Sequence, residues 1–329
     1  MKIIAPIREA AQYEPLIENG AEELYGGVLD EQWNEKYGSW VEFNRRGNFS
    51  AQGNFRSYQE LRQVIQKAAE DQIPFFLTMN AIGLTASQIP YLRDILRKYV
   101  DCGGHRVIVG NWLMLQLALE EDCEPTISSC AGIYNLETAR FWEKAGAKRL
   151  ILPRSISLSA LRECMYGCGA HLEWEVFMMN SGCKFSDSMC RSLHNTSAGA
   201  LCSFLDQRRK SYLDPAGNEI TGRAVTEMKS DSFYYRQLYT GNCSIGCGQC
   251  AIWELLQLQT DSVKIVGRLM PTEQLIRCIK LTAQNISIAA RSACKDQYLQ
   301  EMTLPAVFLG QDICRNHSNC YYREINHPK

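Results

Sequence analysis

The chain has 329 residues, enough for one large domain or two smaller ones, and its 46% of apolar and 22% of charged residues are ordinary for a globular protein. Its formal net charge of −1 argues against a generally basic surface for nucleic acids, although a local basic patch could still bind RNA. The first residues do not resemble a signal peptide, and no uncharged stretch reaches the ~20 residues that span a bilayer. We therefore expect a cytoplasmic protein with no membrane partner.

Short apolar segments alternate with amphipathic helical segments along most of the chain. The predicted strands are 2–5, 23–25, 74–78, 106–109, 125–129, 149–153, 173–178 and 263–266. The predicted helices are 8–19, 58–71, 86–100, 112–120, 136–145, 157–166, 251–259 and 272–289. A connection over 28–55, rich in Asn, Gly, Arg and aromatic residues, follows the second strand and is too long to be a simple link.

This repeated alternation predicts an α/β fold in which eight parallel strands close into a TIM-type (β/α)8 barrel. A doubly wound open sheet is the alternative, but no Gly-x-Gly-x-x-Gly follows the first strand. We expect residues 1–292 to form the barrel, including a cysteine-rich insertion over 180–260 between strands seven and eight. Residues 293–329 are expected to form a C-terminal tail that packs on the barrel.

Fifteen cysteines are many for a chain of this length, and six of them fall in or next to the predicted insertion. In a reducing cytosol, clustered thiols indicate a metal site rather than disulfides. Only Cys247-x-x-Cys250 has the close spacing of a zinc ligand pair, whereas the ligands of iron–sulfur clusters are spaced more loosely. We predict an iron–sulfur cluster first, zinc second, and an unligated cysteine-rich loop third. The six cysteines are Cys183, Cys190, Cys202, Cys243, Cys247 and Cys250.

Other cysteines are scattered along the chain and are predicted to be small core residues, namely Cys102, Cys164, Cys278 and Cys294. Two more, Cys314 and Cys320, lie in the tail. They could approach the same site, although a turn on the surface is the simpler interpretation.

The residues that follow the predicted strands are candidates for chemistry, because the loops at the carboxyl ends of barrel strands meet at one mouth. Turn formation alone accounts for residues such as Asn80, Asn111 or Asn180. Arg154 and Lys264 need more explanation, since a cation at the end of a buried strand must face solvent, an acid or an anionic ligand.

Several segments carry motifs in a fixed order, and on these the chain resembles the peptidase U32 family, the so-called collagenase-like proteins. The segments are 2–6 with 20–27, 149–154, 173–190 and 261–268, and together they span roughly residues 1–290. The signature is an acidic-x-Phe strand, here Glu175 and Phe177, that leads to two cysteines seven positions apart. One departure is clear: the family usually carries Gly-[Ala/Ser]-x-Cys where this chain has Asn180-Ser181-Gly182-Cys183.

The resemblance implies chemistry other than collagen hydrolysis. Several members are iron–sulfur proteins for oxygen-independent hydroxylation, either of RNA pyrimidines or of a quinone precursor, and in some prephenate is the implied oxygen donor. The resemblance implies a [4Fe-4S] cluster held by Cys183, Cys190 and Cys247, with Cys250 close behind. Zinc stays the alternative, from the close spacing of Cys247 and Cys250. The remaining ligand is either Cys202 or Cys243.

The candidate catalytic residues are Arg154 and Lys264, which with Arg268 would hold an anionic oxygen donor or a phosphate by charge-assisted hydrogen bonds. The candidate substrate-binding residues are Tyr25, Asn80, Glu175 and Arg268. A peptidase is a competing function, for which Cys183 or Cys190 with His194 is the only candidate pair. A non-catalytic subunit that binds a homologous U32 chain is another. The sequence leaves the substrate and the oligomeric state open.

Overall fold

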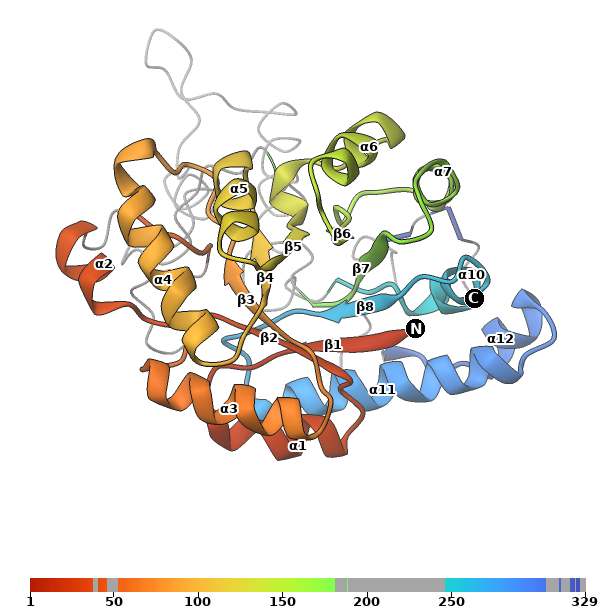
Figure 1. The fold of residues 1–329 in the computed structure, drawn as a ribbon. Coiled ribbons are helices and arrows are strands. Elements are labelled where there is room, and N and C mark those ends of the chain that lie inside the picture. Colours follow the sequence, from red (N-terminus) through yellow and green to blue (C-terminus); the bar gives the residue numbers. More distant parts are fainter. Residues whose placement is uncertain are drawn as a thin grey trace, which may run out of the picture.

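Eight parallel strands form a closed barrel in chain order, with β1 paired to β8, in the computed structural model of the chain (Figure 1). The structure describes residues 1–37, 41–45, 53–180, 188, 246–305, 314, 320–322 and 324–325. This closure confirms the predicted TIM-type barrel and excludes the open sheet. The strands are β1 (Lys2–Pro6), β2 (Glu23–Gly26), β3 (Phe75–Met79), β4 (Arg106–Val109), β5 (Glu124–Ile127), β6 (Arg149–Ile151), β7 (Glu173–Met179) and β8 (Ser262–Ile265).

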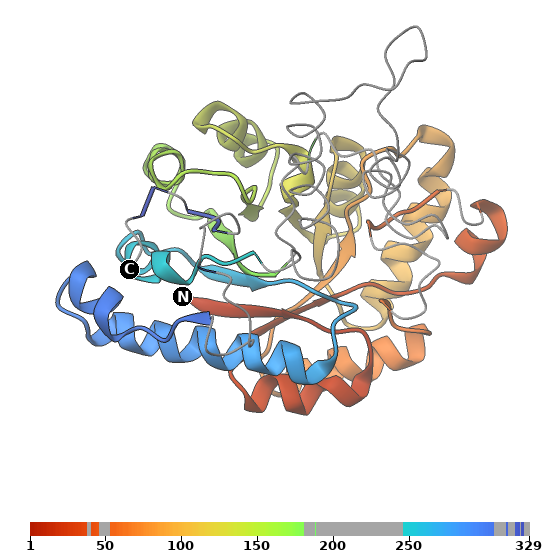
Figure 2. The same cartoon turned by 180° about the vertical axis from the view of Figure 1, so that it is seen from behind.

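Helices follow the strands and cover the outside of the barrel. They are α1 (Tyr13–Glu18), α3 (Tyr58–Glu70), α4 (Ile89–Asp101), α5 (Trp112–Glu120), α6 (Leu136–Lys144), α7 (Leu158–Gly167), α10 (Ile252–Gln257) and α11 (Thr272–Arg291). Several begin where a side chain accepts a backbone N–H of the first turn, as Ser57 does for α3 and Asn111 for α5. Figure 2 shows α1 and α11 side by side against β1 and β8.

In the described part of the chain, two α-helices lie where no helix was predicted. The first, α2 (Glu31–Tyr37), occupies part of the long connection after β2, where the Asp30 carboxylate accepts the Trp33 N–H at 2.8 Å. The Trp33 side chain is completely buried, so tertiary packing supports a helix that has little periodicity of its own. The second, α12 (Lys295–Glu301), follows α11 in the predicted tail.

The scattered cysteines divide into two groups. Cys102, Cys164 and Cys278 are buried, as predicted for small core residues. Cys294 is exposed, so the prediction for it is wrong. The reason is its position: Cys294 is the N-cap residue of α12, beyond the helix that packs on the barrel.

The predicted insertion lies between Met179, the last residue of β7, and Ser262, the first residue of β8. Cys183, Cys190, Cys202 and Cys243 lie outside the described residues, and the domain boundaries remain predictions. Within the described part, none of the helices has the length and apolar character needed to cross a bilayer.

Candidate active site at the barrel mouth

The mouth of the barrel, the rim formed by the carboxyl ends of the strands, gathers polar side chains from several elements. Asn80, just after β3, donates from Nδ2 to Ser128 Oγ at 3.3 Å, and its Oδ1 accepts the Arg45 backbone N–H at 3.2 Å. Arg45 also donates from Nη1 to Cys130 Sγ at 3.2 Å. Arg45 of the long connection after β2 therefore lies over the ends of β3 and β5, in a polar cluster with Asn80 at the mouth.

Arg268, a predicted substrate-binding residue, is buried at the mouth and holds this connection in place. Its Nη1 donates to Asn54 Oδ1 at 3.0 Å and to Thr78 Oγ1 at 3.2 Å, and its Nη2 donates to Asn44 Oδ1 at 3.2 Å. A planar guanidinium suits this task because its donors diverge in fixed directions. The sequence showed Arg268 as a strand-end cation but did not indicate Asn44 or Asn54 as its partners.

Gly27 is required for this anchor. A Cβ built on Gly27 would lie 2.2 Å from Asn54 Oδ1 and 2.6 Å from Arg268 Nη1. We expect Gly27→Ala to lower the free energy of unfolding by about 1–3 kcal/mol, because the added methyl group must displace buried partners. Gly83→Ala is the matched control, since a Cβ on Gly83 meets nothing within 4 Å. Urea unfolding of both variants measures the difference, and equal stability of the two would contradict the anchor.

Below the mouth, Lys264 lies in the barrel interior between an acid and an aromatic ring. Its Nζ is 2.7 Å from Glu175 Oε1 and 3.7 Å from the centroid of the Tyr25 ring, while Tyr25 Oη donates to the Ile265 carbonyl at 3.2 Å. Burial lowers the pKa of Lys264 from its ordinary value, and the nearby Glu175 opposes this shift. The structure thus brings three predicted site residues into contact. Of the three predicted alternatives for Lys264 (solvent, an acid or an anionic ligand), it shows an acid, Glu175.

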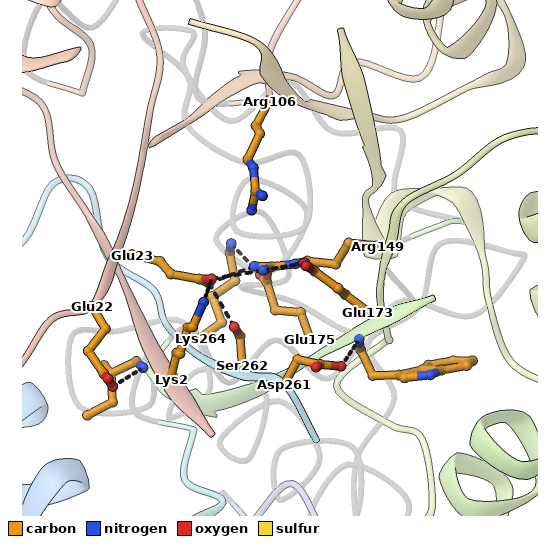
Figure 3. Close-up of polar contacts among 12 residues, drawn as sticks. Lys2, Glu22, Glu23, Arg106, Arg149, Glu173, Glu175, Asp261, Ser262 and Lys264 are labelled. Atoms are coloured by element: carbon orange, nitrogen blue, oxygen red, sulfur yellow. Dashed lines mark hydrogen bonds and ion pairs between the residues drawn. The ribbon is translucent and has the colours of Figure 1, made fainter. Parts of the chain in front are cut away.

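A buried ionic network continues from Glu175 toward the amino ends of the strands (Figure 3). Arg149 donates to both carboxylate oxygens of Glu23, at 2.6 and 2.8 Å, and to Glu175 Oε2 at 3.2 Å. Ser262 donates to Glu23 Oε2 at 2.7 Å, and the Arg149 guanidinium lies 4.6 Å from the centroid of the Phe76 ring. The interior of the barrel below Lys264 is therefore ionic where many barrels carry branched apolar side chains.

Sequence reasoning missed Glu23, Arg149 and Ser262 as members of this network. The available signal was a charged residue at the first position of an otherwise apolar strand, as at Glu23 and Arg149. Alternation along the strand places such a side chain on the same face as the residue two positions later. Since Tyr25 faces the interior, Glu23 must face it too.

Arg154 lies beyond the end of β6, with its guanidinium 4.0 Å from the centroid of the Phe177 ring. Phe177 is the aromatic residue of the signature strand β7, and its ring centroid lies 6.3 Å from that of Tyr321 in the tail. Arg154 is thus held against the ring of an adjacent strand by a cation–π contact. Its predicted catalytic role is not tested by this geometry.

Cys247 is held at the carboxyl end of β7. It forms an antiparallel bridge with Met179, and the N–H groups on either side of the bridge are used: Asn180 donates to the Gly246 carbonyl at 2.7 Å and Gly248 to the Met178 carbonyl at 2.8 Å. Asn180 has φ +70°, a left-handed conformation that Gly and Asn adopt more readily than other residues. Asn180, which stands where the family usually has Gly, can therefore adopt the same left-handed turn.

Several described thiols lie near this point: Cys250, Cys314 and Cys320 influence Cys247, and Cys278 Sγ lies 3.4 Å from Asn180 Nδ2. Burial raises the pKa of Cys247 well above its ordinary value and that of Cys250 to about 12, and the neighbouring thiols of Cys314 and Cys320 add to both shifts. Across the described ranges, no three His, Cys, Asp or Glu side chains are placed to hold a single metal ion. Cys247 and Cys320 lie side by side, joined by a β-bridge, and cysteine thiolates are the usual ligands of iron–sulfur clusters.

Comparison with known proteins places these features in a family. The family model described as "Peptidase family U32" matches residues 8–311. The chain belongs to peptidase family U32. A search of curated proteins finds no match to this U32 chain.

Solved structures resemble this U32 chain only distantly. The U32 peptidase Mk0906 has 14% sequence identity and a TM-score of 0.44, with 67% of this chain and 86% of that chain covered. A structure described as native KDPGal has 9% identity and a TM-score of 0.45, covering 88% and 95% of the two chains. A thiamine phosphate pyrophosphorylase from Pyrococcus furiosus has 12% identity and a TM-score of 0.41, covering 85% and 96%.

Proposed function

We propose that this U32 protein is an iron–sulfur enzyme that hydroxylates RNA or a small aromatic, quinone-type substrate without molecular oxygen. The observation that carries the proposal is the gathering of thiols, with Cys247 and Cys250 among them, beside the carboxyl end of β7, the signature strand. Metal ligands in a (β/α)8 barrel are expected at this rim, because substrates enter there. Cys183, Cys190 and Cys202 remain the proposed further ligands in the segment after β7.

A cluster at the mouth would supply electron transfer and an iron site at which a substrate oxygen can bind. The chain's own residues would position the substrate. Arg154, against the Phe177 ring at the mouth, is proposed to bind an anionic group of the oxygen donor or a phosphate. Asn80 and Tyr25 are proposed to contact the substrate from β3 and β2.

Lys264 and Glu175 are proposed to set the charge at the floor of the site. They contact each other at 2.7 Å, so their opposite charges largely cancel at the floor. Arg268 is proposed to have an indirect role: it fixes Asn44 and Asn54, in the connection after β2, by hydrogen bonds. Of the proposed catalytic residues, Arg154 is therefore the first to test.

The test begins with protein purified under nitrogen, for which we expect a brown solution with about four irons and four sulfides per chain. RNA and quinone extracts from cells that produce the wild type are then compared by mass spectrometry with extracts from cells that produce Arg154→Gln. We expect a product heavier by one oxygen atom only with the wild type. A colourless protein that cleaves peptides would instead support the peptidase. Iron-loaded protein active only after addition of a second U32 chain would support the partner-subunit function.

A further inference from the structure

The helix α5 is apolar on its outer side as well as on the side that packs on the barrel. From Trp112 to Leu119 it carries no charged residue, and Gln116 is its one polar residue in this stretch. Trp112 and Leu119, seven positions apart and therefore on one side of the helix, are exposed. The neighbouring helix α4 instead presents Arg97 to solvent. A helix that is apolar all round is usually covered on every side, so the outer side of α5 is suited to a contact with another molecule.

The exposed side of α5 continues into an aromatic cluster with α6. Trp112 is 49% exposed and Phe141 of α6 is 51% exposed, and their ring centroids lie 5.5 Å apart. The buried Trp142 ring supports both, with its centroid 6.4 Å from that of Trp112 and 5.1 Å from that of Phe141. Leu119 Cδ1 would lie 3.2 Å from a Cβ built on Gly146, so Leu119 extends the apolar surface to the turn after α6. Apolar side chains exposed together in this way mark a binding surface.

The outer side of α6 adds charges of both signs to this surface. Glu137, Phe141 and Lys144 are exposed and follow the spacing i, i+4, i+7, which places them on one side of the helix. Arg140 contacts Glu137 Oε1 at 3.1 Å and donates from Nε to the Gly167 carbonyl at 3.0 Å, so Arg140 is directed toward the end of α7. The Glu137 side chain is still 80% exposed. Along its exposed side, α6 therefore presents an acid, an aromatic ring and a base, in that order.

A surface with this order of charges is complementary to a second copy of itself. When two α6 helices lie antiparallel across a two-fold axis at Phe141, each Glu137 faces the partner's Lys144 and the two Phe141 rings meet. The formal net charge of −1 opposes the association of two copies only weakly. RNA fits this surface less well, because the carboxylates of Glu120 and Glu137 border it and repel phosphates.

We propose that the α5–α6 patch, formed by Trp112, Leu119 and Phe141, binds a second copy of this chain in a two-fold symmetric dimer with the two α6 helices antiparallel. The aromatic rings form the apolar centre of the contact, where large aromatic side chains supply most of the affinity. The Glu137–Lys144 pairs form its polar rim and fix the orientation of the two copies. This contact goes beyond the proposed function and does not depend on which reaction the barrel catalyses.

Sedimentation equilibrium of the full chain over the micromolar range tests the apolar centre. We expect the wild type to dimerise and Phe141→Glu to raise the Kd of the dimer at least about tenfold, because each copy would place a carboxylate at the centre of the contact. Leu269→Glu is the matched control: Leu269 follows β8, away from the patch, and is 47% exposed. The control should leave the Kd unchanged. Circular dichroism of each variant checks that the fold is retained.

An exchange of charges tests the antiparallel arrangement. Glu137→Lys alone would bring lysines together at both ends of the contact, and Lys144→Glu alone would bring carboxylates together, so each single variant should weaken the dimer about threefold at low salt. An equimolar mixture of the two single variants pairs unlike charges again and should dimerise as tightly as the wild type. The double variant Glu137→Lys, Lys144→Glu should do the same. A contact with an unrelated protein would not show this recovery.

Hydroxyl-radical oxidation of the wild type, read by mass spectrometry, tests the surface without any substitution. Trp112 and Phe141 should be oxidised in dilute protein and protected in concentrated protein, while Leu269 reacts equally in both. Protection at every concentration would mean that this chain itself covers the patch, and would overturn the proposal. A wild type that stays monomeric, a dimer that tolerates Phe141→Glu, or mixed charge variants that do not recover would each overturn it as well.

Discussion

Replacing Arg149 with methionine is expected to lower the free energy of unfolding by about 3–5 kcal/mol, which is the usual cost of removing one partner from a buried ion pair. Arg149 is 2% exposed, and its guanidinium contacts Glu23, Glu173 and Glu175. Without it, the carboxylates of Glu23 and Glu175 remain in the barrel interior with less positive charge to balance them. The free energy of unfolding of a globular domain is only about 5–15 kcal/mol, so this loss would be a large fraction of the total stability.

Urea unfolding followed by circular dichroism measures this effect. The matched control is Arg97→Met, because Arg97 also contacts a carboxylate, at 2.9 and 3.1 Å from Glu121, but its side chain is 62% exposed. The exposed pair is expected to contribute less than about 1 kcal/mol. Similar losses in the two variants would show that burial does not set the strength of the Arg149 contacts.

The ionic network also bears on where chemistry can occur. It fills the barrel interior from Glu23 up to Lys264, and Lys264 touches Tyr25, which lies closer to the mouth. In the proposed function the substrate would meet Arg154 and the thiols at the rim, above this charged floor. The predicted residues Lys264 and Glu175 thus join the floor to the mouth.

The fold could be predicted from the sequence because short, mostly apolar segments alternate with amphipathic helical segments along the chain. Strands such as Arg106–Val109 and helices such as Trp112–Glu120 have the predicted bounds. The helix α2 could not be predicted, since its stability depends on burial of the Trp33 ring, which packs against Tyr37 and Phe43. Local periodicity carries no information about such contacts.

The site was predicted less completely, for a physical reason. Position at a strand end predicted that Tyr25, Asn80, Arg154, Lys264 and Arg268 would reach the mouth, but Lys264 lies within β8, in the barrel interior below it. Such a position does not indicate which side chains meet across the barrel. The pairing of Arg149 with Glu23 joins residues 126 positions apart, and the approach of Tyr321 to Asn180 joins residues 141 apart. Contacts of this range follow from the closed topology, and a single sequence does not encode them in any local pattern.

Glu23→Gln is expected to change how stability depends on pH. Burial alone would raise the pKa of Glu23, but hydrogen bonds from Arg149 and Ser262, and the charge of Arg149, bring it below its ordinary value of 4.5. The folded state therefore holds Glu23 ionised at a pH where the unfolded chain already takes up a proton. By linkage, the stabilisation from Glu23 is present above pH 4.5 and is lost as the pH falls through the folded-state pKa.

The Gln side chain of the variant is not ionisable, so the variant should not show the loss of stability that protonation of Glu23 causes in the wild type. At neutral pH the amide introduced by Glu23→Gln cannot balance Arg149, and we expect the variant to be less stable than the wild type by about 3 kcal/mol or more. Below the folded-state pKa the wild type carries a neutral carboxyl group that resembles the amide, so the difference should shrink toward zero. Thermal unfolding from pH 7 downward measures both curves. If the stabilities of wild type and Glu23→Gln differed by the same amount at every pH, ionised Glu23 would not stabilise the fold through Arg149. An ionised partner must lose its contribution to the free energy of unfolding when it is protonated.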